Sequence, residues 1–230
     1  METFAAFGDS VLKGVLYEGG HYRVMKKSSF CRICESQLAI RVDNKAKFGI
    51  IISKGREIFD RNTEAVKAST GKYVIFEFGG NDCAFNWPEV SADPDASHIP
   101  MTTISDFTDI YSYLIDETIS LGKTPLLLSL PPIDGVKYFD HISRGLYADN
   151  ILRWMKGDKN FSTNWHERYN LEVFKLAKKR GVPVIDITSP FLEEKDYTRF
   201  LCEDGIHPNK EGHKLIANAI VNEVESFVNN

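Results

Sequence analysis

Three short polar segments of this chain hold the residue types that acyl transfer to water requires. They are Gly8-Asp9-Ser10, Gly79-Gly80-Asn81-Asp82 and Asp204-Gly205-Ile206-His207. A serine hydroxyl becomes a good nucleophile when a histidine removes its proton, and a carboxylate on the other ring nitrogen keeps the histidine in the correct tautomer. Ser10 can be this nucleophile, His207 the general base and Asp204 the carboxylate. The side-chain amide of Asn81 can donate a hydrogen bond to the oxyanion that forms.

These segments can act together only if the fold brings them close to one another, and the pattern of apolar and amphipathic stretches indicates an α/β fold. Short apolar runs alternate with amphipathic stretches, which is typical of a parallel sheet with helices on both faces. The predicted strands are Thr3–Phe7, Ile40–Asp43, Tyr73–Phe78, Pro125–Leu130 and Pro183–Ile187, with Tyr22–Met25 a weaker extra one. Two polar segments follow a strand directly, and the third comes after the last strand. All three are therefore expected at the carboxyl edge of the sheet, where open α/β folds bind ligands.

Amphipathic stretches predict the helices between and after these strands. They are Ser29–Ala39, Ser53–Ser69, Ile104–Leu121, Trp165–Arg180 and Lys210–Val228. Three of the helices are followed by Gly71, Gly122 and Gly181, and glycine commonly ends a helix because it adopts the left-handed conformation without steric cost. These glycines are expected to mark the returns from helix to strand.

Two longer stretches, at about 83–103 and 131–164, interrupt the alternation within what the sequence predicts to be a single domain spanning residues 1–230. Each follows the carboxyl end of a predicted strand, so both are expected to overhang the site. Their aromatic side chains are candidate substrate contacts, and a neighbouring histidine joins them. These candidates are Phe85, Trp87, Trp154, Trp165 and His166. The alternative is that the aromatics form a small separate core under the long loops.

The polar segments resemble the conserved blocks of the SGNH or GDSL-like hydrolase family, named for Ser, Gly, Asn and His. Gly8-Asp9-Ser10 matches the first block, Gly79-Gly80-Asn81-Asp82 the third and Asp204-Gly205-Ile206-His207 the fifth, while Asn44-Lys45-Ala46-Lys47-Phe48-Gly49 aligns with the second. The resemblance implies a flavodoxin-like, three-layer α/β/α sandwich with five parallel strands in the order 2-1-3-4-5. It implies no cofactor, and we expect no metal. It also implies an oxyanion hole made of the N–H groups of Ser10 and Gly49 and the Asn81 side chain.

These observations predict a serine esterase that hydrolyses carboxylic esters of short acyl groups, such as acetylated carbohydrates, through an acyl-Ser10 intermediate. One alternative is a metal-dependent phosphoesterase, because Asp9, Asn81, Asp82 and His207 could all bind a cation at one sheet edge. A non-catalytic ligand-binding module is the other. Asp9 and Asp82 are expected to brace their turns by hydrogen bonds and not to transfer protons.

Composition narrows the class of partner. The net charge is −4, and basic residues are dispersed among acidic ones, so neither nucleic acid nor an anionic membrane is an expected partner. No apolar run approaches the length of a bilayer and no leader pattern opens the chain, which predicts a cytoplasmic location. The expected partner is a small-molecule ester, and the sequence predicts no oligomeric state.

Four cysteines are too few for a disulfide scaffold and are expected to stay reduced. Cys31 and Cys34 have the spacing of a redox or zinc pair, but helical periodicity favours a role in core packing. Cys83 directly follows the third block, and its role is left open.

Overall fold

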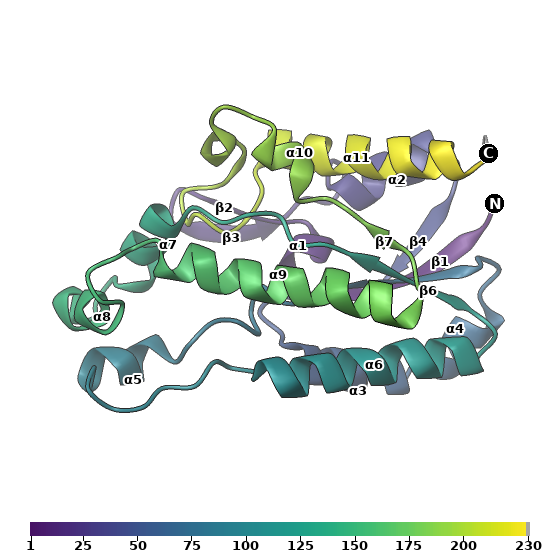
Figure 1. The fold of residues 1–230 in the computed structure, drawn as a ribbon. Coiled ribbons are helices and arrows are strands. Elements are labelled where there is room, and N and C mark those ends of the chain that lie inside the picture. The colour runs from purple at the N-terminus through teal and green to yellow at the C-terminus, as the bar shows by residue number, and fades with distance from the viewer. Residues whose placement is uncertain (229–230) are drawn as a thin grey trace.

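The computed structural model describes the backbone of residues 1–228 and the side chains of residues 1–224. Its centre is a five-stranded parallel sheet (Figure 1). The strands are β1 (Thr3–Gly8), β4 (Arg41–Asn44), β5 (Tyr73–Glu77), β6 (Thr124–Leu128) and β7 (Val184–Ile185). They lie in the order β4-β1-β5-β6-β7. Numbered by their sequence among the sheet strands, this is 2-1-3-4-5, so the predicted topology is confirmed.

Helices cover both faces of the sheet, as Figure 1 shows, and each helical layer packs on its own apolar cluster. One face carries α3 (Ile52–Asp60), α4 (Thr63–Ala68), α6 (Ile104–Ser120) and α9 (Phe161–Arg180). The other carries α2 (Phe30–Gln37), α10 (Ser189–Leu192) and α11 (Lys210–Val228). Along β1, Ala5 and Phe7 face the first layer and Ala6 faces the second. This strand is buried on both sides, as a central parallel strand requires.

The helix predicted over Ser53–Ser69 is two helices in the structure. α3 ends at Asp60 and α4 begins at Thr63. Asn62 lies between them, and its side chain donates a 2.7 Å hydrogen bond to the carbonyl oxygen of Ile58. Asparagine satisfies this end carbonyl while its own backbone leaves the helical conformation, which explains the break. Helical periodicity alone does not detect such a break.

Of the three glycines predicted to end helices, Gly122 and Gly181 do so, with φ of 73° and 64° at the ends of α6 and α9. The prediction for Gly71 was wrong, because α4 already ends at Ala68. A Cβ atom on Gly71 would lie 2.6 Å from the carbonyl oxygen of Thr3. Gly71 is therefore needed for close contact with the start of β1.

A two-stranded antiparallel hairpin, β2 (Val15–Glu18) and β3 (His21–Val24), stands outside the main sheet. Only its second strand was predicted. Gly19 and Gly20 form the turn with φ of 59° and 80°, the positive angles that a two-residue hairpin turn of this hand needs. The short helix α1 (Ser10–Lys13) connects β1 to the hairpin.

The two long stretches that interrupt the alternation contain short helices. These are α5 (Trp87–Ala92) in the first and α7 (Gly135–Ile142) and α8 (Ala148–Trp154) in the second. They gather at the carboxyl end of the sheet (Figure 1) and share one apolar cluster. A short 3₁₀ helix, η1 (Tyr197–Phe200), precedes the segment that holds Asp204 and His207.

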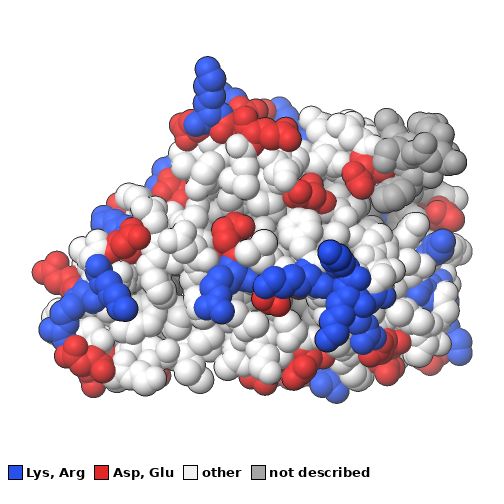
Figure 2. Space-filling view, viewed as in Figure 1, with Lys and Arg blue, Asp and Glu red and all other residues white. Residues whose placement is uncertain are grey.

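Charges of both signs are mixed on the face drawn in Figure 2, where Lys and Arg follow the line of α9. The last turn of that helix holds Lys178, Lys179 and Arg180, which complement the negative end of the helix dipole. Within residues 1–228, none of the helices combines the length and the apolar character needed to cross a bilayer.

Candidate active site

Ser10 stands where the chain leaves the first strand. β1 ends at Gly8, and Ser10 is the first residue of α1, whose N-cap is Asp9. Asp9 Oδ1 accepts a 2.9 Å hydrogen bond from the N–H of Val11, which fixes the turn. A Cβ atom on Gly8 would lie 2.6 Å from the carbonyl oxygen of Glu77. Glycine therefore lets the end of β1 stay close to β5 while Ser10 turns toward the site.

Ser10, His207 and Asp204 form a continuous chain of hydrogen bonds. His207 Nε2 lies 2.8 Å from Ser10 Oγ, and His207 Nδ1 lies 2.6 Å from Asp204 Oδ2. Asp204 Oδ1 accepts hydrogen bonds from the N–H groups of Ile206, at 3.1 Å, and His207, at 3.2 Å. Burial opposes ionisation of Asp204, but these hydrogen bonds and the charge of His207 outweigh it and lower the pKa of the carboxyl group. An ionised carboxylate can only accept, so it holds the proton on Nδ1 and leaves the Nε2 lone pair for the serine hydroxyl.

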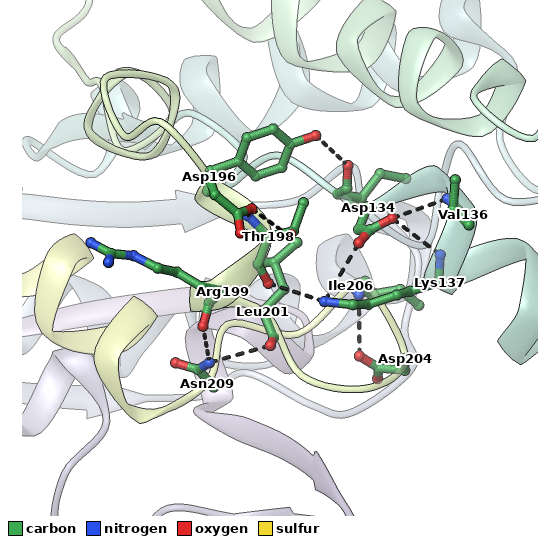
Figure 3. Close-up of polar contacts among 12 residues, drawn as sticks. Asp134, Val136, Lys137, Asp196, Thr198, Arg199, Leu201, Asp204, Ile206 and Asn209 are labelled. Carbon is green, nitrogen blue, oxygen red and sulfur yellow. Dashed lines mark hydrogen bonds and ion pairs between the residues drawn. The ribbon is translucent and has the colours of Figure 1, made fainter.

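The loop that carries this acid and base is held against the second insertion (Figure 3). The N–H of Asp134, at the start of α7, donates a 2.8 Å hydrogen bond to the carbonyl oxygen of Gly205. A Cβ atom on Gly205, whose φ is 73°, would lie 2.6 Å from the Asp134 carbonyl oxygen. Lys137 Nζ donates to the carbonyl oxygen of Thr198, in η1. The insertion therefore fixes the position of the Asp204–His207 loop in addition to overhanging the site.

Asn209 fixes the other end of this loop, also drawn in Figure 3. Its Nδ2 donates to the carbonyl oxygens of Arg199, at 2.7 Å, and Leu201, at 3.2 Å. Its Oδ1 accepts from the N–H groups of Glu211 and Gly212, in the first turn of α11. One side chain thus joins η1, the loop and the last helix.

Asn81 lies beyond the end of β5 and lines the same cleft as Ser10. Its Nδ2 donates a 3.0 Å hydrogen bond to Asp9 Oδ2. A side-chain amide has two N–H groups, so this contact orients Asn81 and leaves the second N–H for a ligand. The N–H of Ser10 is at the first helical position of α1, where helical N–H groups have no partner within their own helix. Both groups are suited to an oxyanion.

Gly49 ends a segment that runs alongside β1. The N–H groups of Lys45 and Lys47 donate to carbonyl oxygens of β1, and Gly49 turns away with φ of 70°. The ring of Phe48 stacks on His207, with centroids 6.2 Å apart. This segment therefore approaches the base, but Gly49 does not line the cleft, and its part in an oxyanion hole stays a prediction.

A pair of buried carboxyl groups, Asp9 and Glu77, lies behind the nucleophile and shares a side-chain hydrogen bond. Burial raises the pKa of both groups, and the charge of Asp9 raises that of Glu77 further, to well above its ordinary value. Asp9 accepts hydrogen bonds from Val11 and Asn81, whereas Glu77 Oε2 accepts one, at 3.2 Å, from the N–H of Leu12. His207 and the donors around Asp9 oppose the effect of burial on its pKa, whereas the charge of Asp9 adds to that effect at Glu77, so the proton of the pair belongs on Glu77.

Asp82 is buried on the far side of Asn81. Its Oδ1 accepts hydrogen bonds from the N–H of Ile52, at 2.9 Å, and from Thr102 Oγ1, at 2.6 Å. Its Oδ2 has no hydrogen-bond partner among the described residues, and burial raises the pKa of Asp82 to about 7. Asp82 therefore joins the third block to α3 and to the first insertion, which is the bracing role predicted for it.

A cleft of about 80 Å³ lies beside Ser10 and His207. Four of the five predicted substrate contacts line it, namely Phe85, Trp87, Trp165 and His166. Trp154 does not line it and packs behind the wall, with its ring centroid 4.7 Å from that of Phe85. The aromatic side chains thus form a small separate core, and the inner side of that core is the cleft wall.

Two aromatic residues beside the base were not predicted. Tyr22, on the β2–β3 hairpin, packs edge-on against His207 with centroids 5.5 Å apart, and Phe48 stacks on the same ring. Tyr22 is 42% exposed and Phe48 48%. The Tyr22 hydroxyl lies 2.9 Å from His141 Nε2, which fixes the ring. Gly19-Gly20 between two strand-like runs is a sequence signal for this hairpin. A hairpin predicted there, directly after the Ser10 segment, would have placed Tyr22 near the end of β1.

The cysteines carry no catalytic chemistry in this arrangement. Cys31 and Cys34 are buried core residues between α2 and the sheet, as predicted, and burial raises the pKa of both thiols. Cys83 lines the cleft, but its Sγ donates to the carbonyl oxygen of Gly80 and its pKa is also raised by burial. A thiol held in the protonated form is a poor nucleophile.

Among the side chains of residues 1–224, no group of three His, Cys, Asp or Glu residues is arranged to hold a metal ion. Of the ligands considered for a phosphoesterase, Asp9 accepts hydrogen bonds at both carboxylate oxygens, and Asp82 accepts two at Oδ1. His207 Nε2 is directed at Ser10.

Comparison with known proteins places this geometry in a family context. Two curated relatives match parts of the chain. A GDSL esterase/lipase CPRD49 from Arabidopsis thaliana is 26% identical over 183 residues, which are 77% of this chain and 64% of that protein. The thioesterase 1/protease 1/lysophospholipase L1 of Escherichia coli strain K12 is 29% identical over 84 residues, 36% of this chain and 38% of that protein. The chain thus spans less than two thirds of either relative.

Solved structures match nearly the whole fold. A lipase/acylhydrolase from Enterococcus faecalis superimposes with a TM-score of 0.67 at 18% identity, over 98% of this chain and 96% of that one. Axe2, an acetylxylan esterase from Geobacillus stearothermophilus, has a TM-score of 0.67 at 18% identity, over 97% and 94%. The sequence model of the GDSL-like lipase/acylhydrolase family matches residues 6–215, from within β1 to within α11. This chain therefore belongs to the GDSL-like lipase/acylhydrolase family.

Proposed function

We propose that this protein is a serine esterase that hydrolyses carboxylic esters through an acyl-Ser10 intermediate. The observation that carries the proposal is the hydrogen-bonded chain from Ser10 Oγ through His207 to Asp204. All three side chains are at most 5% exposed, so water competes little for these hydrogen bonds. Membership of a lipase/acylhydrolase family supports the same chemistry.

In the first half-reaction, His207 Nε2 takes the proton of Ser10 as Oγ attacks the ester carbonyl carbon. The carbonyl π-electrons move to its oxygen, and the resulting oxyanion accepts hydrogen bonds from the N–H of Ser10 and the free N–H of Asn81, with Gly49 N–H the third candidate donor. Collapse of the tetrahedral intermediate breaks the bond to the alcohol oxygen, which receives the proton from His207 Nε2. The alcohol leaves and an acyl-Ser10 ester remains.

In the second half-reaction, water takes the place of the alcohol. His207 Nε2 removes a proton from the water as its oxygen attacks the acyl carbon, and the same donors hold the oxyanion. Collapse returns the proton to Ser10 Oγ and releases the carboxylic acid. Asp204 stays ionised throughout and stabilises the imidazolium in both halves.

The dimensions of the site favour a short acyl group. A cleft of about 80 Å³ is far smaller than the roughly 300–1,000 Å³ of pockets that enclose drug-sized ligands. His207 protonates the leaving alcohol, so the alcohol lies beside the exposed rings of Tyr22 and Phe48. Such rings suit stacking on a carbohydrate, and a structural neighbour carries the name acetylxylan esterase. We propose esters of short acyl groups on sugar-like alcohols as the substrate class.

A fluorophosphonate reagent, followed by peptide mass spectrometry, tests the nucleophile. We expect one covalent adduct, on Ser10, because among residues 1–224, whose side chains the structure describes, only this serine is hydrogen-bonded to a histidine held by a carboxylate. The Ser10→Ala variant should lose both labelling and hydrolysis of p-nitrophenyl acetate. Ser120→Ala, which removes an exposed hydroxyl at the end of α6, is the matched control and should behave as wild type. Labelling on another serine, or full activity without Ser10, overturns the proposal.

The same assay separates the two alternatives. Activity that persists in excess EDTA is expected of a serine esterase, whereas a metal-dependent phosphoesterase should lose its activity and regain it on addition of a divalent cation. A non-catalytic binding module should give neither turnover nor labelling while the protein remains folded by circular dichroism.

A further inference from the structure

Three polar side chains on one face of α9 line the cleft beside Ser10. They are Ser162, Trp165 and His166, spaced at i, i+3 and i+4, so that they lie together on the helix surface. Ser162 is 6% exposed and His166 3%. Ser10 and His207 line the same cleft, so a group bound at Ser10 also meets this face of α9.

Within the part of the chain that the structure describes, Ser162 Oγ and Trp165 Nε1 have no hydrogen-bond partner, while His166 Nδ1 lies 3.7 Å from Glu167 Oε1. Seven buried polar side-chain atoms are unpaired there, and four of them lie within residues 162–167: Ser162 Oγ, Trp165 Nε1, His166 Nδ1 and Glu167 Oε1. A buried polar group left unpaired costs about 1–3 kcal/mol, so such groups are normally satisfied. Several on one wall of a catalytic cleft point to a ligand that satisfies them.

Other polar groups of the same cleft are satisfied within the protein. Trp87 Nε1 donates a 3.1 Å hydrogen bond to the Tyr138 hydroxyl, and Cys83 Sγ donates to the carbonyl oxygen of Gly80. The polar groups of Trp87 and Cys83 are hydrogen-bonded within the protein, whereas Ser162 Oγ and Trp165 Nε1 are not. The face of α9 formed by Ser162, Trp165 and His166 is the α9 wall of the cleft. Imperfect packing of the whole aromatic cluster would not distribute unpaired groups in this way.

The chemistry of the α9 wall matches a neutral hydroxyl group. Trp165 Nε1–H can only donate, and the Ser162 hydroxyl can donate or accept. His166 Nδ1 lies 3.7 Å from Glu167 Oε1, too far for a hydrogen bond but close enough for the carboxylate to favour the proton on that nitrogen. Nε2 is then the acceptor left for a ligand. A hydroxyl group is the simplest group that both donates to an imidazole nitrogen and accepts from a serine or an indole N–H.

Charge argues against an acidic ligand at this wall. No Lys or Arg occurs among the described residues that line the cleft, while Asp9 and Glu77 do line it and Glu167 adjoins His166. A carboxylate or phosphate on the acyl chain would meet the charges of Asp9 and Glu167 with no cation among those lining residues to offset them. The ligand group is therefore uncharged.

We propose that the α9 wall is an acyl subsite and that the enzyme acts on esters of short hydroxyacids. The acyl hydroxyl donates to His166 and accepts from Ser162 or Trp165. The hydroxyl belongs to the acyl group and not to the alcohol, because the narrow cleft holds a small group while the exposed rings beside His207 leave room for a large one. This inference rests on the proposed esterase function of Ser10.

Matched methyl esters that exchange one methyl group for a hydroxyl test the proposal. The pairs are methyl butanoate with methyl 3-hydroxypropanoate, and methyl 3-methylbutanoate with methyl 3-hydroxybutanoate. Each kcat/KM is divided by the rate constant of hydroxide-catalysed hydrolysis, which removes intrinsic reactivity. We expect wild-type enzyme to prefer the hydroxyl ester by about 10-fold or more, because a site built to bond a hydroxyl rejects the analogue that lacks it.

Conservative variants then locate the preference. Ser162→Ala and Trp165→Phe each remove one hydrogen-bonding group with little change in shape, and each should reduce the preference by about 3- to 10-fold, the effect of one neutral hydrogen bond. Both should change kcat/KM for methyl butanoate much less. His166→Phe should reduce the preference as well, and His166→Gln should restore part of it. Ser120→Ala serves as the control and keeps the wild-type preference.

Each outcome decides between distinct conclusions. Active, Ser10-labelled enzyme without a hydroxyl preference overturns the acyl subsite and leaves the esterase proposal intact. So does a preference that survives all three substitutions in folded protein. If the preference appears instead for 2-hydroxyethyl butanoate over propyl butanoate and the α9 variants abolish it, the wall binds the alcohol and the assignment to the acyl group is wrong. Absence of Ser10 labelling together with absence of turnover is failure of the esterase proposal itself.

Discussion

Asp204 and Glu77 are both buried carboxyl groups near the nucleophile, at 0% and 1% exposure, yet their pKa values move in opposite directions. Asp204 accepts hydrogen bonds from the His207 ring and from two backbone N–H groups. Glu77 accepts from the backbone N–H groups of Leu12 and Asp9, but it also faces the carboxyl group of Asp9. Burial is the largest influence on each group, and it is outweighed only at Asp204.

The difference teaches that the charges and donors beside a buried carboxyl group decide whether it is an anion. His207 and two N–H groups lower the pKa of Asp204, whereas the carboxyl group of Asp9 raises that of Glu77. Asp204 can serve as the triad carboxylate because its loop supplies these donors. Glu77 keeps its proton and donates a hydrogen bond to Asp9, which in turn orients Asn81. The comparison can be tested with one substitution applied four times, the exchange of a carboxyl group for an amide of the same shape at Asp204, Asp82, Asp9 and Glu77.

The largest effect is expected at Asp204. In Asp204→Asn, the N–H groups of Ile206 and His207 hold the amide oxygen at the Oδ1 position, so the new NH₂ group faces His207 Nδ1. The imidazole must then carry its proton on Nε2, toward Ser10, and cannot act as base. We expect kcat on p-nitrophenyl acetate to fall by about 10⁴-fold with the fold intact. A loss below tenfold would contradict the role of Asp204.

The second test concerns the pH dependence of stability at Asp82, whose pKa burial raises from 3.8 to about 7. The folded protein retains this proton at pH values where the unfolded chain has lost it. The contribution of Asp82 is therefore fully present below pH 3.8 and is lost as the pH rises to about 7. The Asp82→Asn variant cannot titrate, and its amide oxygen can still accept from Ile52 and Thr102.

Urea unfolding at several pH values measures this effect. Because each pKa unit corresponds to about 1.36 kcal/mol, the free energy of unfolding of Asp82→Asn should rise relative to wild type by on the order of 4 kcal/mol between pH 4 and pH 8. A constant difference across that range would show that Asp82 is ionised in the folded protein at all these pH values. Activity of the variant, measured where both proteins are folded, should remain close to wild type.

A smaller effect is expected at Asp9. In Asp9→Asn, the N–H of Val11 holds the amide oxygen at the Oδ1 position, and the new NH₂ group points at the amide NH₂ of Asn81. Two donors then face each other, which displaces Asn81 from the oxyanion position. We expect kcat to fall by roughly 10- to 100-fold, part of the 100- to 1,000-fold typical of losing an oxyanion donor.

A double-mutant cycle with Asn81→Ala identifies the cause. If Asp9 acts through Asn81, Asp9→Asn should have little further effect once Asn81 is alanine. Additive losses would mean that Asp9 supports catalysis by another route. Asparagine is also a good N-cap, so α1 should remain formed in each variant.

The sheet order was predicted from the resemblance to the SGNH family, and the residue pattern itself was sufficient to predict the elements that carry Ser10, Asn81 and the Asp204–His207 loop. These follow from apolar runs ended by glycine and polar residues, a signal that is local in sequence. The β2–β3 hairpin and the helices of the insertions were missed because they are short, and short elements give little periodicity. Pro183–Ile187 was predicted as a strand, but only Val184–Ile185 pairs in the sheet.

Two features of the site depended on contacts that the sequence does not display. Ser162 was not a candidate because α9 was predicted to begin at Trp165, four residues after its observed start at Phe161. The predicted helix therefore did not include Ser162 and could not place it on the same face as His166. Glu77 did give a signal, since an acidic residue within a strand as apolar as Tyr73–Phe78 requires a buried partner. That the partner is Asp9 follows only from the pairing of β1 with β5.

The smallest effect, and the one that sharpens the comparison most, is expected at Glu77. In Glu77→Gln, the N–H of Leu12 holds the amide oxygen at the Oε2 position, and the new NH₂ group faces Asp9. This is the arrangement that a protonated Glu77 already has, with a donor toward Asp9 and an acceptor toward Leu12. We therefore expect kcat/KM within about threefold of wild type, since no net hydrogen bond is lost. The same exchange that disables Asp204 should be nearly silent here.

Glu77→Leu is the matched control, because it removes the donor and the acceptor together. The N–H of Leu12 would then be buried without a partner, at about 1–3 kcal/mol, and Asp9 would lose the donor that faces it, so this variant should unfold at lower urea concentration than Glu77→Gln. If Glu77→Gln instead lost activity by 100-fold or more while staying folded, Glu77 would be an anion in the working enzyme. Two adjacent buried carboxylates would then both be charged, and neighbouring charges and donors would no longer explain which of these carboxyl groups is an anion.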